Sequence, residues 1–155
     1  MDLADILAER AVLTLSGALN KRQLFESVAE KAAELTGFAP DDLLSTLLAR
    51  EELGSTGLGN GLAIPHGKVA GLKGVTAIFV RLDQPIEFDA VDDEPVDLVI
   101  TLLAPIGAGA DHLKALSKVA RLLRTETVTE QLRAETDPAR LHAILVAPLE
   151  THYAA

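Results

Sequence analysis

Apolar residues recur at every third or fourth position in two segments near the start of the chain, a spacing that predicts amphipathic helices. The first segment runs from Lys21 to Thr36. Asn20 before it and Gln23 within it form a capping-box pattern, and Gly37 stands where a left-handed residue often ends a helix. The second begins near Pro40, a residue suited to the first turn, and ends before a glycine-rich segment.

Two later segments are almost continuously apolar, which is typical of strands covered on both faces. They run from Val75 to Leu82 and from Val96 to Ala104, and residues 83–95 between them are acidic and rich in turn formers. Residues 62–64 indicate a further short strand.

Three more helices are predicted after the second apolar strand. Asp111 caps a long one, Thr127 and Glu130 form a capping box for a shorter one, and Asp137-Pro138 opens the last. The sequence contains no internal repeat and no linker. Strands interspersed with helices therefore indicate a single α/β domain with helices on the faces of its sheet, and the strand order stays open.

Composition narrows the function classes. The chain has 155 residues and a net charge of -9, which argues against nucleic-acid binding because such binding depends on neutralising phosphates. An acidic surface either attracts a basic partner face or only keeps the protein in solution. Without cysteine there is no disulfide, thiolate metal site or cysteine nucleophile. An acidic N-terminus and the lack of an apolar run near ~20 residues predict a cytoplasmic protein that is not inserted in a membrane.

Residues 54–74 contain seven glycines. Their spacing does not fit a dinucleotide-binding fingerprint, because Gly57-x-Gly59 lacks the third glycine. It does not fit a Walker loop either, because Gly67-Lys68 lacks the Ser or Thr that should follow. The segment therefore argues against nucleotide binding.

His66 is the candidate nucleophile of this segment. A neutral imidazole is a nitrogen nucleophile near pH 7, because its usual pKa is ~6.5. Pro65 biases Ile64 towards an extended conformation, and Gly67 allows a tight turn that leaves one side of the ring uncovered. We therefore expect a strand to end before His66 and to present the ring at a rigid, open position. On the residues alone, a loop histidine without chemistry is the commoner alternative.

Other side chains are candidates for binding a phosphoryl group on that ring. Arg50, near the end of the second helix, offers a planar bidentate donor, or is only a solvated helix end. His112, in the first turn of a helix, is kept neutral by the helix dipole and can donate, or bonds a nearby carbonyl. Ser55 and Asn60 either contact phosphate or hold the loop. Two histidines without a carboxylate at ligand spacing are poor evidence for zinc.

The run GSTGLGNGLAIPHGK at residues 54–68 resembles the phosphorylation-site signature of one class of known proteins. These are the IIA proteins of the bacterial phosphotransferase system, in the mannitol/fructose/nitrogen class. Three further stretches agree with that class: residues 85–92, 95–98 and 111–113. The resemblance covers nearly the whole chain, so we expect residues 1–155 to form one EIIA type-2 domain with its signature at 50–68. The implied fold is a mixed β-sheet flanked by α-helices.

The resemblance also implies roles for the candidate residues. His66 is the residue phosphorylated, on Nε2, and Arg50 and His112 bind and orient the phosphoryl group. The residues implied to support the phosphate loop are Ser55, Asn60 and Gly67. The donor is an HPr-like phosphocarrier protein, and no metal or other cofactor is expected. The chain is then a phosphotransferase component with a phosphohistidine intermediate, and its standing as a free enzyme stays open.

Within the class, the signature looks most like the nitrogen-regulatory branch. The chain lacks the cysteine that IIB domains of this class normally phosphorylate, and it lacks the membrane-spanning part of a permease. We therefore expect a regulatory switch that is recognised by target proteins. The alternative is a stand-alone sugar-specific IIA component that passes phosphate to a IIB domain.

Overall fold

The computed structural model describes residues 2–148. Its helices are α1 (Leu3–Ile6), α2 (Lys21–Thr36), α3 (Pro40–Glu52), α4 (Ala110–Leu123), α5 (Glu126–Ala134) and α6 (Pro138–Val146), with a 3-10 turn η1 at Glu9–Ala11. Its strands are β1 (Val12–Leu15), β2 (Gly57–Gly59), β3 (Leu62–Ala63), β4 (His66–Val69), β5 (Thr76–Ile86) and β6 (Val96–Pro105).

Within residues 2–148, six strands form one mixed sheet in the order β1-β5-β6-β3-β2, and β4 pairs with β6 as well. The long strands β5 and β6 are antiparallel and form the centre. β1 runs parallel to β5, whereas β3 and β4 run parallel to β6, one after the other along the same edge. The mixed sheet implied by the resemblance is therefore confirmed.

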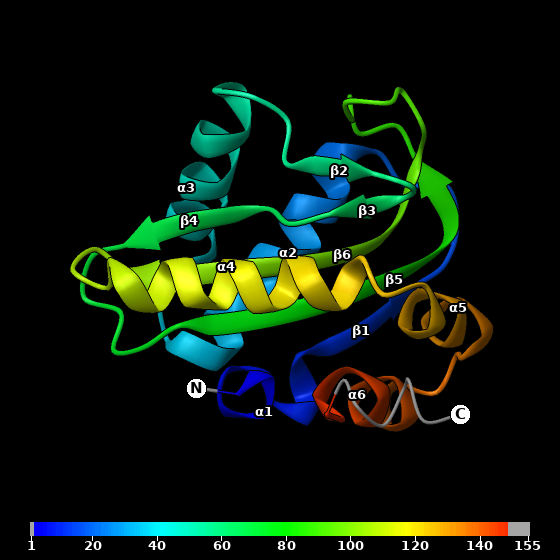
Figure 1. Cartoon of the computed structure of the whole chain (residues 1–155). Helices are drawn as coiled ribbons and strands as arrows, with labels where there is room; N and C mark the ends of the chain where they lie inside the picture. The colour runs from blue at the N-terminus through cyan, green and yellow to red at the C-terminus, as the bar shows by residue number, and fades with distance from the viewer. Residues whose placement is uncertain (1, 149–155) are drawn as a thin grey trace.

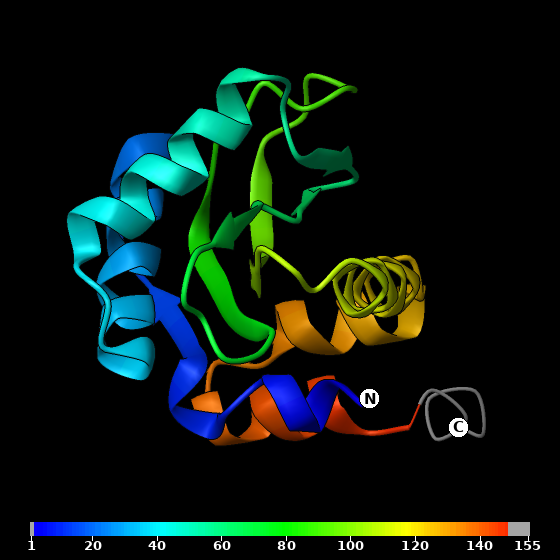
Figure 2. The ribbon, with the colours of Figure 1, turned by 90° about the vertical axis from the view of Figure 1, so that its left-hand side faces the viewer.

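Helices cover both faces of this sheet (Figures 1 and 2). α2 and α3 pack together on one face, and α4 lies across the other face against β6. α6 packs against β1, with α1 beside it. Every residue of β6 except Asp97 and Pro105 is buried, as its continuous apolar sequence predicts for a strand covered on both faces. No helix in the described part of the chain is long and apolar enough to cross a membrane.

The two helices predicted from the early pattern are α2 and α3, and their bounds are confirmed. Asn20 Oδ1 accepts a hydrogen bond from the Gln23 backbone N–H at 2.8 Å, and Gln23 Oε1 accepts one from the Asn20 N–H at 2.9 Å. This capping box begins α2, and Gly37 ends it with a φ of 81°. Pro40 is the first residue of α3, which ends at Glu52, directly before the glycine-rich segment.

The strand predictions miss three strands, β1, β2 and β4, and end β5 too early. β1 has no counterpart among them, because a short run with a polar residue in it has little pattern of its own, and pairing with β5 makes it a strand. β5 continues to Ile86, past the predicted end at Leu82. A register shift between Arg81 and Ile86 accommodates the extra polar residues, and the Ser16 hydroxyl donates to the Asp83 carboxylate at 2.7 Å.

Two of the later helix starts also differ from prediction. The N-cap of α4 is Gly109, so Asp111 lies in the first turn and is not the cap. The N-cap of α5 is Thr125, so the capping box assigned to Thr127 and Glu130 is wrong. The Thr125 hydroxyl instead donates to a carbonyl in the last turn of α4, at 2.9 Å. The predicted Asp cap of α6 is confirmed.

Candidate active site

His66 lies at the edge of the sheet where the chain passes from β3 to β4. β3 ends at Ala63, as expected of a strand that stops short of the histidine, but His66 itself opens the next strand. The Pro65 carbonyl accepts a hydrogen bond from the Leu102 N–H of β6 at 2.9 Å, so the backbone stays attached to the sheet between the two strands. The ring is half-buried on this firmly held segment.

The hydrogen bond of the His66 ring determines which nitrogen can react. Nδ1 lies 2.8 Å from the carbonyl oxygen of Ile64. A carbonyl oxygen only accepts, so Nδ1 carries the proton in this contact. In the neutral ring, Nε2 then keeps its lone pair and is the nucleophilic atom. The geometry thus favours the nitrogen that the family resemblance implied.

His112, on the first turn of α4, faces the ring of His66. The two ring centroids are 5.8 Å apart and the ring planes are inclined by 68°. His112 is 6% exposed, and its Nε2 has no hydrogen-bond partner although the atom is buried. A buried polar atom is usually paired, so an unpaired one beside a nucleophile is available to a ligand there.

The environment of His112 favours the neutral form of its ring. Burial is the main cause that lowers its pKa, and the electrostatic interactions with His66 and Lys68 lower it further. The sequence predicted a neutral ring from the helix dipole, and burial is the main cause instead. A neutral ring carries one N–H, which suits it to donate a single hydrogen bond.

Arg50 reaches the same place from α3. Its Nη1 donates to the carbonyl oxygen of Gly54 at 2.9 Å, which bends the side chain towards the glycine-rich loop. Arg50, His66 and His112 together line one cavity of about 550 Å³. The other lining residues are Thr46, Ala49, Leu53, Gly67, Lys68, Gly109, Leu113 and Leu116. Three elements far apart in sequence, α3, β4 and α4, therefore bring the three predicted residues together.

Gly67 allows α3 to approach β4 closely. A Cβ atom on Gly67 would lie 2.8 Å from Cγ2 of Thr46, a separation that real Cβ contacts do not reach. Thr46 is itself held, since its hydroxyl donates to the Asp42 carbonyl at 3.0 Å. Gly67 thus allows α3, which carries Arg50, to lie close to β4. The tight turn expected at Gly67 is not found, because the residue lies within β4 and pairs with β6.

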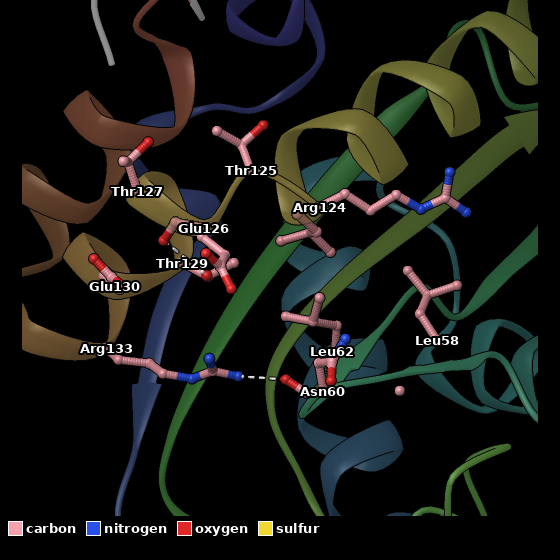
Figure 3. A pocket seen from close by; sticks show the side chains of 12 residues that line it. Leu58, Asn60, Leu62, Arg124, Thr125, Glu126, Thr127, Thr129, Glu130 and Arg133 are labelled. Atoms are coloured by element: carbon pink, nitrogen blue, oxygen red, sulfur yellow. Dashed lines mark hydrogen bonds between the residues drawn. The ribbon is translucent and has the colours of Figure 1, made fainter. Parts of the chain in front are cut away.

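Ser55 and Asn60 are not among the residues that line this cavity. The Ser55 hydroxyl donates to the Phe88 carbonyl at 3.0 Å and accepts from the Gly57 N–H at 3.1 Å. Asn60 lies at the turn between β2 and β3, where its backbone carbonyl accepts a hydrogen bond from Nη2 of Arg133 at 2.7 Å (Figure 3). The Ser55 side chain thus holds the loop in this structure, whereas the hydrogen bonds of Asn60 come from its backbone N–H and carbonyl.

Sequence reasoning missed the apolar rim of the cavity. Leu113 is 66% exposed and Leu53 is 85% exposed, and neither was a candidate. Leu113 lies on the outer face of α4, whereas its neighbour His112 is buried. Thr46 was missed as well, because nothing in its surroundings in the sequence relates it to His66. Among residues 2–148, no three His, Cys, Asp or Glu side chains gather closely enough to hold a metal ion.

Known proteins resemble this chain over most of its length. Residues 5–147 match the family described as phosphoenolpyruvate-dependent sugar phosphotransferase system, EIIA 2. The nitrogen regulatory protein of Bradyrhizobium diazoefficiens is 46% identical over 151 residues, which cover 97% of this chain and 99% of that protein. A fructose-specific EIIA component of the phosphotransferase system from Haloferax volcanii is 37% identical over 110 residues, 71% of each chain.

The fold agrees with these relationships. The crystal structure of nitrogen regulatory protein IIA-Ntr from Neisseria meningitidis matches with a TM-score of 0.85 and 38% identity, covering 91% of this chain and 97% of that one. Both the sequence and the fold therefore place the chain in the EIIA type-2 family of the phosphotransferase system, and it is most like the nitrogen regulatory proteins of that family.

Proposed function

We propose that this protein is a phosphoryl carrier that accepts a phosphoryl group on Nε2 of His66 from a phosphorylated HPr-like carrier protein. The contact between Nδ1 of His66 and the Ile64 carbonyl carries the proposal, because it leaves Nε2 as the nucleophile. In the transfer, the P–N bond to the donor's histidine breaks as the P–Nε2 bond forms. The His66 ring keeps its Nδ1 proton throughout, and the donor's imidazole is the leaving group.

The neighbouring side chains supply donors for the phosphoryl oxygens. Arg50 is permanently charged and has N–H groups beyond the one that bonds Gly54. The unpaired Nε2 of His112 adds a further donor in the tautomer that carries its proton there. Charge-assisted hydrogen bonds of this kind stabilise a transferring phosphoryl group as its charge is redistributed.

The purpose that we propose is regulatory. Phosphorylation adds up to about two negative charges and three acceptor oxygens at a half-buried ring, which is enough to reverse a contact with a target protein. The similarity to proteins named nitrogen regulatory proteins supports this assignment. We place the reaction in the cytoplasm, together with the donor protein.

A second function is favoured by one observation. The relative from Haloferax volcanii, which is 37% identical over 110 residues, is named as a fructose-specific EIIA component of the phosphotransferase system. In sugar transport, the phosphoryl group would pass from His66 to a IIB domain. The two functions share the chemistry at His66 and differ only in the acceptor.

Labelling tests the shared chemistry. The wild-type protein and His66→Ala are incubated with labelled phosphoenolpyruvate, the general upstream enzyme and an HPr-type carrier. We expect the wild type to be labelled, with the label mapped to the peptide that contains His66, and the alanine variant to remain unlabelled while folding normally. Full labelling of His66→Ala would refute the assignment.

A further inference from the structure

Directly beside Arg50, the structure holds a nearly buried carboxylate that the proposed chemistry does not use. The Glu51 side chain is 7% exposed, and its Oε2 lies 2.7 Å from the ammonium nitrogen of Lys21. The same carboxylate accepts hydrogen bonds from both polar groups of Thr56: the backbone N–H at 3.0 Å and the hydroxyl at 2.6 Å. Glu51 therefore connects the last turn of α3 to the glycine-rich loop and to the first residue of α2.

Lys21 is held as firmly as its partner. Its ammonium donates to the Phe88 carbonyl at 2.9 Å and lies 4.2 Å from the centroid of the Phe88 ring. The Ser55 hydroxyl donates to the same carbonyl at 3.0 Å. The charges of Lys21 and Glu51 therefore compensate each other. Glu51 holds Thr56 directly, and Lys21 and Ser55 share the Phe88 carbonyl as acceptor.

This connection encloses the residue that accepts the hydrogen bond of Arg50. Nη1 of Arg50 donates to the carbonyl of Gly54, a residue between Glu51 and Thr56. Gly54 has no side chain to pack and neighbouring Leu53 is 85% exposed, so apolar contacts do not hold this stretch. Backbone hydrogen bonds at the end of α3 hold one side of this stretch, from the Gly54 N–H to the Glu51 carbonyl at 3.2 Å and from the Leu53 N–H to the Arg50 carbonyl at 3.1 Å. The hydrogen bonds from Thr56 to the Glu51 side chain hold its other side, after the carbonyl that accepts from Arg50.

We propose that Glu51 is a positioning residue for phosphoryl transfer, which acts by holding the loop that directs Arg50 towards His66. The inference rests on the proposed function. It assigns the effect to the hydrogen bonds between Glu51 and Thr56, and not to the charges of the Lys21–Glu51 ion pair. Misplacing a group that contacts the transferring phosphoryl costs roughly ten- to a hundredfold in rate, which sets the size of the expected effect.

Two double variants distinguish the effect of the Glu51–Thr56 hydrogen bonds from the effect of the Lys21 and Glu51 charges. Lys21→Met/Glu51→Ala removes both charges and cuts both bonds to Thr56. Lys21→Met/Glu51→Gln also removes both charges, but its amide can still accept from the Thr56 N–H and donate to the hydroxyl. We expect phosphoryl transfer to slow roughly ten- to a hundredfold in the first and to stay within about twofold of wild type in the second. Equal rates in the two variants would overturn the inference.

A combination with Arg50→Ala tests whether Glu51 acts through Arg50. In that background, cutting the bonds to Thr56 should slow transfer by about twofold or less, because the residue being oriented is gone. An undiminished loss would mean a general structural role and would overturn the inference. Asp97→Asn is the matched control, because Oδ1 of Asp97 pairs with Nη2 of Arg133 at 2.9 Å at the other end of the loop. Any slowing of transfer by Asp97→Asn should be the same with and without Arg50.

The order of the Arg50 side chain can be measured without any phosphoryl transfer, so this test does not depend on the proposed function. In ¹⁵N NMR relaxation of the Arg50 side chain, we expect an ordered Nε–H in wild type and a mobile one in Lys21→Met/Glu51→Ala. If that variant does not fold, Thr56→Val removes only the hydroxyl bond and should give a smaller loss of order in the same direction. Unchanged order refutes the inference, whereas a wild-type protein that never becomes labelled refutes the proposed function.

Discussion

The ring of His112 meets the ring of His66 edge to face, with centroids 5.8 Å apart, although one residue lies on α4 and the other opens β4. The contact exists because β4 pairs with β6 along one edge of the sheet and α4 packs across β6. An unpaired nitrogen of His112 therefore lies beside the nucleophile, and its consequences can be measured.

Arg50 and His112 are predicted to stabilise the phosphoryl group and not to receive it. Each supplies one or more hydrogen bonds to charged oxygens, and the loss of one is worth ~1.5–3 kcal/mol, or roughly ten- to a hundredfold in rate. Arg50→Ala and His112→Ala should therefore be labelled at His66 but more slowly than wild type, as followed by rapid-quench labelling. If peptide mapping of the wild type found the label on His112, the roles of the two histidines would be exchanged.

Stability should fall with acidification because of His112. Its pKa is lowered by burial, so in acid the unfolded chain takes up a proton that the folded protein resists. The stabilisation is complete above the ordinary histidine pKa of ~6.5 and decreases as the pH falls towards the lower folded value.

Urea unfolding of the wild type and of His112→Gln at pH 7.5 and pH 5.5 checks this. The wild type should lose more stability between the two pH values than the variant, which has no ring to protonate at this position. An equal loss in both proteins would show that His112 does not contribute to the acid sensitivity.

Gly67→Ala should destabilise the protein and slow phosphorylation. Its Cβ would lie 2.8 Å from Thr46 Cγ2, so α3 or β4 must shift, at a cost of about 1–3 kcal/mol in the free energy of unfolding. Thr46→Ser removes that methyl and keeps the hydroxyl, so Thr46→Ser/Gly67→Ala should recover most of the stability.

The control for this pair is Gly74→Ala, because a Cβ on Gly74 meets no atom within 4 Å. Thermal unfolding and the rate of labelling are measured for wild type, Gly67→Ala, Thr46→Ser/Gly67→Ala and Gly74→Ala. A Gly67→Ala variant that is as stable as Gly74→Ala would show that close packing of α3 on β4 is not needed.

How much could be predicted from the sequence depends on the range of the interactions. The capping box of Asn20 and Gln23 is local, so the sequence defines α2 fully. The pairing that makes Val12–Leu15 a strand, and the exposure of Leu113, depend on neighbours distant in sequence. Local patterns made Arg50, His66 and His112 separate candidates, and only the resemblance related them to one another, because no local rule connects three residues on separate elements.

The regulatory proposal predicts that the two forms of the protein bind different partners. A switch needs a target with unequal affinity for the two forms, since equal affinity would shift no equilibrium. The change at His66 is large, because a group with up to about two negative charges replaces a neutral ring on a half-buried edge strand. Pull-downs with His66→Ala and with phosphorylated wild type should therefore recover different proteins. Identical partners from both, together with efficient transfer to a sugar-specific IIB domain, would favour the transport function.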